Sequence, residues 1–156
     1  HDKEQTIDAL KYARDTKRYT LFKKHPTKDH MRYWNEFEEQ GYVSDYSIYV
    51  DAPTDHLVRN ADRIYSSDSI VSYNALLYNK PVCTYKTNDF SEIVPMIDNA
   101  YEIDNIEPVP VDVRNRFLTW WYYNLCIDIN KNDFEERIER RIINHKNNAP
   151  IKELLS

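Results

Sequence analysis

The hydrophobic and polar positions of the first fifty residues predict two helices and two strands. Apolar side chains recur at a loose helical period at the start of the chain, where Thr6 is a candidate N-cap. A short β-prone run follows and is stopped before Pro26, and a later helical stretch ends at Gly41, a residue type favoured just after a helix. The expected elements are a helix at 6–17, a strand at 19–22, a helix at 30–40 and a strand at 47–50.

From Pro53 onward the alternation of elements becomes regular. The pattern predicts a short helix around 57–58, a strand at 63–65, a polar turn at 66–69, a helix that ends at Tyr78 and a strand at 81–85. Short strands that alternate with helices favour βαβ units with right-handed crossovers. We therefore expect an α/β fold, a parallel sheet sandwiched by helices.

The last third of the chain predicts fewer strands and more helix. Residues 100–103 are a candidate strand, and residues 112–126 and 133–147 are expected to form two terminal helices. The segment 108–110 is the best linker candidate, although a rigid turn inside one domain explains it equally well. For a chain of 156 residues we expect a single domain, 1–156, that includes these terminal helices at 112–147.

Composition narrows the classes of function. The net charge of -5 gives no reason to expect a nucleic-acid partner, and no apolar stretch is long enough to cross a bilayer. The first four residues lack the apolar core of a signal peptide, so we expect a cytoplasmic protein, with peripheral attachment to the inner membrane as an alternative.

Cysteine and glycine usage argues against several kinds of site. Cys83 and Cys126 stand far apart and outside any ligand spacing, so we expect reduced thiols and no metal site. Gly41 is the single glycine, whereas dinucleotide fingerprints and P-loops need several. We therefore expect no cofactor.

Two polar clusters follow predicted strands, where ligands bind in open parallel sheets. The first is Lys23, Lys24, His25 and Pro26. Proline fixes the backbone after the histidine, and the imidazole can donate to a phosphate or protonate a leaving group. The alternative is an ordinary exposed loop histidine and solvated lysines.

The second cluster is Ser66, Ser67, Asp68 and Ser69, between a predicted strand and a predicted helix. Its hydroxyls and the free N–H groups of the following helical turn could form a phosphate cradle without glycine. Ser67 or Asp68 could instead serve only as the helix N-cap. The ligand-binding interpretation is favoured because both clusters are expected at strand ends of one sheet, where a single phosphate could contact both.

The segment 57–85, LVRNADRIYSSDSIVSYNALLYNKPVCTY, resembles the signature of capsule polysaccharide Kdo transferases, and LFKKHP upstream fits the same family. The resemblance covers roughly residues 17–125. It implies the C-terminal, Rossmann-like domain of a GT-B glycosyltransferase, in which HP and Ser-rich motifs bind the CMP part of the donor. His25 would then contact the donor phosphate and assist departure of CMP, and the serines would supply hydroxyl contacts. Asn74 stands where the family commonly has an acid, so it can hydrogen-bond a ribose or cytosine but supplies no charge.

The resemblance implies transfer of a sugar from a CMP-activated donor, such as CMP-Kdo or CMP-sialic acid, to a bacterial capsule or surface polysaccharide or a glycolipid acceptor. No acidic catalytic motif of the family's N-terminal half is present, so the chain is expected to be one half of a two-domain enzyme and inactive by itself. The alternatives are a polyol-phosphate transferase that uses a CDP-glycerol donor, and a non-catalytic α/β interaction module. The aromatic run at 117–123 is expected to serve packing or an interface with the missing N-terminal domain, with carbohydrate stacking as the minor alternative.

Overall fold

The computed structural model describes residues 2–23, 31–125, 135–136 and 139. The chain divides into two compact units, His1–Pro108 and Val109–Ser156. The boundary between them falls inside the segment 108–110, which the sequence marks as the linker candidate.

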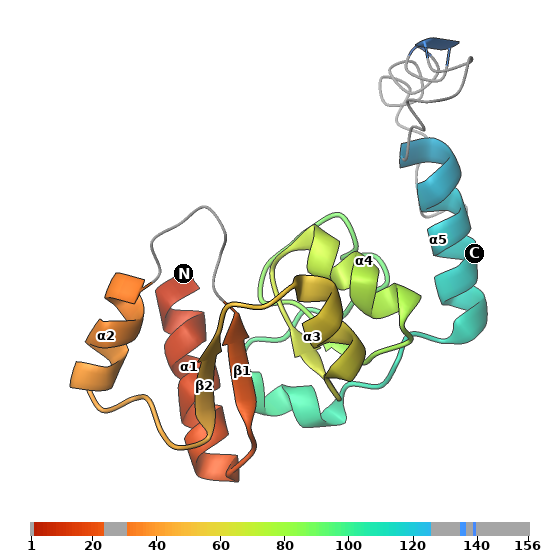
Figure 1. Ribbon diagram of the computed structural model, residues 1–156. Coiled ribbons are helices and arrows are strands. Elements are labelled where there is room, and N and C mark those ends of the chain that lie inside the picture. Colours follow the sequence, from red (N-terminus) through yellow and green to blue (C-terminus); the bar gives the residue numbers. More distant parts are fainter. Residues whose placement is uncertain (1, 24–30, 126–134, 137–138, 140–156) are drawn as a thin grey trace. The chain divides into compact units, whose positions relative to one another are not determined.

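The first unit alternates helices with short strands, as Figure 1 shows. In chain order its elements are α1 (Asp2–Thr16), β1 (Thr20–Lys23), α2 (Met31–Glu39), β2 (Ser47–Val50), α3 (Thr54–Asn60), β3 (Ile64–Tyr65), α4 (Ser69–Leu77), β4 (Val82–Cys83) and the 3-10 helix η1 (Ala100–Asn105). The predicted α/β class is therefore confirmed.

The strands form two parallel pairs. β1 pairs with β2 so that Thr20 faces Ser47, and β3 pairs with β4 so that Ile64 faces Val82. Among the described residues, one parallel bridge also pairs Thr84, directly after β4, with Met96. Within the described residues these are two separate two-stranded sheets. The expectation of one continuous sheet is thus wrong for the described strands, because no ladder of hydrogen bonds joins β1 to β3.

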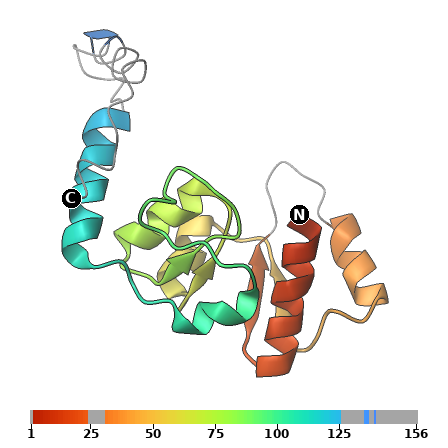
Figure 2. The same cartoon turned by 180° about the vertical axis from the view of Figure 1, so that it is seen from behind.

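Helix α1 holds the two strand pairs together through apolar contacts. Its residues Ala9 and Tyr12 are buried in a cluster against which Phe22 of β1 and Tyr65 of β3 both pack. Leu10 of the same helix is fully buried in a second cluster, which includes Trp34 of α2. Figure 2 shows α1 along one face of the β1–β2 pair. Burial of these side chains, rather than backbone pairing, therefore places β3 relative to β1.

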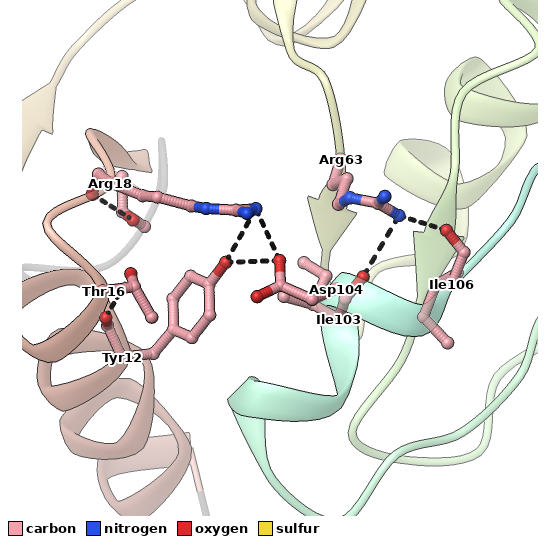
Figure 3. A network of polar contacts seen from close by, with 8 residues as sticks. Tyr12, Thr16, Arg18, Arg63, Ile103, Asp104 and Ile106 are labelled. Carbon is pink, nitrogen blue, oxygen red and sulfur yellow. Dashed lines mark hydrogen bonds and ion pairs between the residues drawn. The ribbon is translucent and has the colours of Figure 1, made fainter.

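Polar contacts reinforce this packing near the C-terminal end of α1 (Figure 3). The hydroxyl of Tyr12 donates to the carboxylate of Asp104 in η1 at 2.9 Å, and the guanidinium of Arg18 donates to the same oxygen at 2.5 Å. The guanidinium of Arg63, just before β3, donates to the main-chain carbonyls of Ile103 and Ile106. Because these carbonyls lie at the end of η1, the arginine supplies donors that the short helix lacks.

The structure corrects two predictions about where helices begin. Helix α1 begins at Asp2, so Thr6 lies inside it and is not its N-cap. Residues 100–103 belong to η1 and not to a strand, because Asn99 and Glu102 form a capping box that starts the helix. Gly41 has a φ of +73°, which confirms the predicted left-handed residue after α2.

The second unit contains α5 (Val111–Leu125), which matches the helix expected at 112–126. Phe117 is buried, and its ring lies 6.2 Å from that of Trp120 and 6.1 Å from that of Trp121. This spacing places the three rings on one side of the helix. Of the helix expected at 133–147, Glu135, Glu136 and Glu139 are described and helical, and the remainder lies outside the described residues. In the described part of the chain, no helix has the length and apolar character needed to cross a membrane.

Candidate functional site

The polar turn 66–68 lies at the carboxyl end of β3, directly before α4. The N–H of Ser66 donates to the carbonyl of Cys83 at 3.1 Å, which extends the β3–β4 pairing by one residue. The hydroxyl of Ser66 accepts a hydrogen bond from the N–H of Asp68 at 3.0 Å. This local bond holds the turn in shape and leaves the hydroxyl proton of Ser66 free to be donated.

Asp68 is the N-cap of α4. Its carboxylate accepts hydrogen bonds from the N–H groups of Ile70 at 2.8 Å and Val71 at 3.4 Å. The expectation that these N–H groups are free to cradle a phosphate is therefore corrected, because a carboxylate of this chain already occupies them. An anion that binds at this turn must instead find its hydrogen-bond donors among nearby side chains.

Ser67 connects the turn to the end of β4. Its hydroxyl donates to the hydroxyl of Tyr85, two residues after β4, at 2.9 Å. The rings of Tyr85 and Tyr65 meet edge to face, with their centroids 5.2 Å apart. The ammonium of Lys86 lies 5.9 Å from the centre of the Tyr85 ring. Two hydroxyls and one positive charge thus gather at the carboxyl ends of two parallel strands.

The ring of Tyr65 packs against that of Tyr85, but its hydroxyl makes its hydrogen bond to a different part of the chain. Its hydroxyl donates to the side-chain oxygen of Gln5 in α1 at 2.8 Å. Burial, together with the nearby carboxylate of Asp8, raises the pKa of Tyr65 well above its ordinary value. Tyr65 is therefore a neutral packing residue between α1 and β3, whereas the Tyr85 hydroxyl faces the serine turn.

The remaining predicted site residues are only partly within the described structure. Lys23 is the exposed last residue of β1, while Lys24, His25 and Pro26 lie outside the described residues. Ser69 is the first residue of α4, and Asn74 is partly buried further along that helix. Lys23 thus lies at the end of one strand pair, and the serines lie at the end of the other. That one phosphate contacts both clusters stays a prediction.

Tyr85 and Lys86 were not among the residues chosen from the sequence. The signal was nevertheless present, because the strand expected at 81–85 ends at Tyr85. The rule that selected the serines, a polar residue at the carboxyl end of a parallel strand, applies equally to this tyrosine and to the lysine after it.

Buried hydroxyl side chains lie in α4 and directly after β4. Ser72 of α4 and Thr84 are both fully buried, and the side-chain amide of Asn88 donates to the Ser72 hydroxyl at 3.4 Å. The amide oxygen of Asn88 in turn accepts from the N–H of Phe90 at 2.8 Å. These contacts tie the loop after β4 to α4, so the loop that carries Tyr85 and Lys86 is anchored on both sides.

The described side chains of this arrangement suit an acceptor-rich anion. Among the described residues, no group of three or more His, Cys, Asp or Glu side chains is placed to hold a metal ion. Hydroxyl donors and the Lys86 ammonium are what a phosphate needs. In comparisons with known proteins, no family model, no curated protein and no solved structure matches this chain.

Proposed function

We propose that this chain is the donor-binding half of a GT-B glycosyltransferase that takes a cytidine-activated sugar. The observation that carries the proposal is the serine turn between β3 and α4, whose Ser67 hydroxyl meets the Tyr85 hydroxyl beyond the end of β4. In α/β proteins this edge of a parallel sheet is where nucleotides bind. The resemblance of the segment 57–85 to capsule polysaccharide transferases supports the same assignment.

The chemistry of the turn suits the phosphate part of such a donor. Phosphate oxygens only accept hydrogen bonds, so their site must supply donors and positive charge. Ser66 has a hydroxyl proton to give, and Lys86 adds a cation at the same edge. In this proposal, Lys24 and His25, which lie outside the described residues, add positive charge for the donor phosphate, and His25 protonates the departing CMP.

Asn74 is assigned to the nucleoside part of the donor. Asn74 is partly buried in α4, and its main-chain carbonyl accepts the helical hydrogen bond from the N–H of Tyr78, so this bond does not use the side chain. A carboxamide both donates and accepts, so it can pair with a ribose hydroxyl or with the edge of cytosine. Because the carboxamide carries no charge, its recognition of the nucleoside rests on hydrogen bonds and not on an ion pair.

The acceptor is assigned to the other half of the enzyme. In this proposal a preceding N-terminal domain binds the polysaccharide or glycolipid and provides the catalytic base, at the cytoplasmic face of the inner membrane. Positioning of both substrates supplies much of an enzyme's rate enhancement. The chain alone is therefore expected to bind donor and to transfer nothing.

Calorimetric titration with CMP and CDP, with UMP as the base control, tests the proposal. Selective binding of the cytidine nucleotides is expected, and Ser66→Ala and Ser67→Ala are each expected to weaken it. Thr119→Ala is the matched control, because it removes an exposed hydroxyl from α5 and should change nothing. Equal binding of UMP, or no binding by folded protein, would refute a cytidine donor site.

One observation favours a second candidate, a non-catalytic interaction module. The Asp68 carboxylate caps α4, which is the purely structural role expected of such a turn. The same titration separates the two candidates, since a module of this kind binds no nucleotide. If cytidine nucleotides do bind, product analysis with the whole enzyme distinguishes sugar transfer from the transfer of glycerol phosphate by a CDP-glycerol enzyme.

A further inference from the structure

The hydrogen bond between Ser67 and Tyr85 has a direction that decides which of the two can bind an anion. Ser67 is the donor and the Tyr85 oxygen is the acceptor, at 2.9 Å. The single hydroxyl proton of Ser67 is therefore committed to Tyr85. What Ser67 has left are lone pairs, which repel a phosphate oxygen.

The Tyr85 hydroxyl, in contrast, still has its own proton to donate. Its oxygen accepts from Ser67, so its own proton points away from that bond. Its ring is fixed by the edge-to-face contact with Tyr65 at 5.2 Å, and the Lys86 ammonium lies 5.9 Å from the ring centre. The phenol proton is thus the donor that this pair can offer, beside a positive charge.

We propose that Tyr85 is a binding residue for the phosphate groups of the ligand, and that Ser67 acts as a positioning residue that orients the Tyr85 hydroxyl. This inference rests on the proposed function for the identity of the ligand as a nucleotide. The assignment of phosphate recognition to Tyr85 rests on the hydrogen bond from Ser67, the ring contact with Tyr65 and the nearby Lys86 ammonium, and not on which nucleotide binds, so the two can be tested separately.

The carboxylate of Asp68 explains why a phosphate at this turn needs a side-chain donor such as the Tyr85 hydroxyl. Asp68 already fills the N–H groups of Ile70 and Val71, where a phosphate would otherwise bind a helix start. Its negative charge also disfavours an anion on its own side of the turn. A phosphate at this edge is therefore directed toward the hydroxyl of Tyr85 and the ammonium of Lys86.

The experiment compares two tyrosines of one ring pair in the full chain. Binding of CDP and, separately, of inorganic pyrophosphate is measured by calorimetry for Tyr85→Phe and for Tyr65→Phe. Tyr85→Phe keeps the ring contact and removes the proposed donor, so affinity for both ligands should fall on the order of 10-fold. Tyr65→Phe removes a hydroxyl that bonds Gln5, so both affinities should stay unchanged.

A double-mutant comparison tests the positioning role of Ser67. If Ser67 acts only through Tyr85, Ser67→Ala weakens binding in the native background and has no further effect once Tyr85→Phe is present. Losses that simply add would show that Ser67 contacts the phosphate itself and would overturn its positioning role. A downfield shift of the Tyr85 ring carbon that bears the hydroxyl on pyrophosphate addition, absent for Tyr65, is the expected spectroscopic signature.

Each remaining outcome decides one or both proposals. Native affinity in Tyr85→Phe, or equal losses in both tyrosine variants, overturns the inference and leaves nucleotide binding standing. Pyrophosphate binding that depends on Tyr85, without preference for cytidine over uridine nucleotides, supports the inference and refutes the cytidine donor. If the folded native chain binds neither CDP nor pyrophosphate, both proposals are wrong.

Discussion

The guanidinium of Arg18 lies 2.5 Å from the carboxylate of Asp104, a residue that follows it by 86 positions. The same carboxylate oxygen accepts the hydroxyl of Tyr12 at 2.9 Å. Two interactions therefore attach the segment around the end of α1 to η1, and their surroundings differ. The Arg18 side chain is 57% exposed, whereas Tyr12 as a residue is only 7% exposed.

The buried partner of Asp104 is expected to carry more stability than the exposed one. Tyr12→Phe should lower the free energy of unfolding by about 1 kcal/mol, because it removes a shielded hydrogen bond to a charged group. Arg18→Ala should cost less, roughly 0.5 kcal/mol, because water and salt screen an exposed ion pair. Urea unfolding of the three proteins measures both changes.

Tyr19→Phe is the control for this comparison. Tyr19 is 74% exposed, and loss of its hydroxyl should leave the free energy of unfolding unchanged. A larger loss in Arg18→Ala than in Tyr12→Phe would contradict the argument, since it would mean that the ion pair dominates despite its exposure.

The role of Asp68 can be separated into a cap and a charge. Asp68→Ala should lower the free energy of unfolding by about 1 kcal/mol, because the N–H groups of Ile70 and Val71 lose their acceptor. Asp68→Asn retains an acceptor and should be close to native in stability. Thermal and urea unfolding measure this difference.

The Asp68→Asn protein should also bind nucleotide more tightly than the native chain. Removal of an exposed negative charge beside a bound phosphate is expected to improve affinity by roughly 2- to 5-fold, the range of exposed charge interactions. Asp62→Asn, a change of the same kind at an exposed position just before β3, is the control for net charge. If Asp68→Asn instead weakens binding as Ser67→Ala does, the carboxylate contacts the ligand directly.

Local signals in the sequence predicted most of the first unit. The strand predicted at 47–50 has the same bounds in the structure, and the predicted bounds of β3 and α4 differ from the observed ones by one residue. Polar turns on both sides of a short strand restrict where it can begin and end. The segment 100–103 failed for an equally local reason. Its apolar alternation resembles a strand, but the reciprocal bonds of Asn99 and Glu102 favour a helical start and prevail.

The position of the polar turn was predicted, but its hydrogen bonds were not. A turn at residues 66–69 follows from the strand and helix that flank it, and β3 and α4 do flank it in the structure. The bond from Ser67 to Tyr85 joins residues 18 positions apart, and no local pattern encodes it. The arrangement of the strands likewise depends on long-range packing around α1, which local patterns do not encode. A single sheet was therefore expected, whereas β1 pairs only with β2 and β3 only with β4 among the described strands.

Cys83 supplies a prediction about pH. The thiol is fully buried in β4, with its sulfur 3.6 Å from the carbonyl oxygen of Ile64. Burial raises the pKa of Cys83 from an ordinary value of 9.0 to about 12. At pH 9, alkylation of Cys83 in the folded protein should therefore be slower than in urea by roughly 500-fold, because the thiolate is the reactive form. Cys126→Ser removes the other thiol from the measurement.

The same shift fixes how Cys83 affects stability as the pH rises. The folded state holds the thiol proton more tightly than the unfolded state, so its stabilising contribution is complete below pH 9 and is lost progressively as the pH approaches about 12. The free energy of unfolding should fall with pH more steeply in the native chain than in Cys83→Ala, by at most about 1.4 kcal/mol per pH unit. All other titratable groups are the same in both proteins, so the difference between the two slopes isolates the thiol. Parallel slopes, or fast alkylation of the folded protein at pH 9, would mean that water reaches the strand pair from which the Ser66 turn and Tyr85 extend.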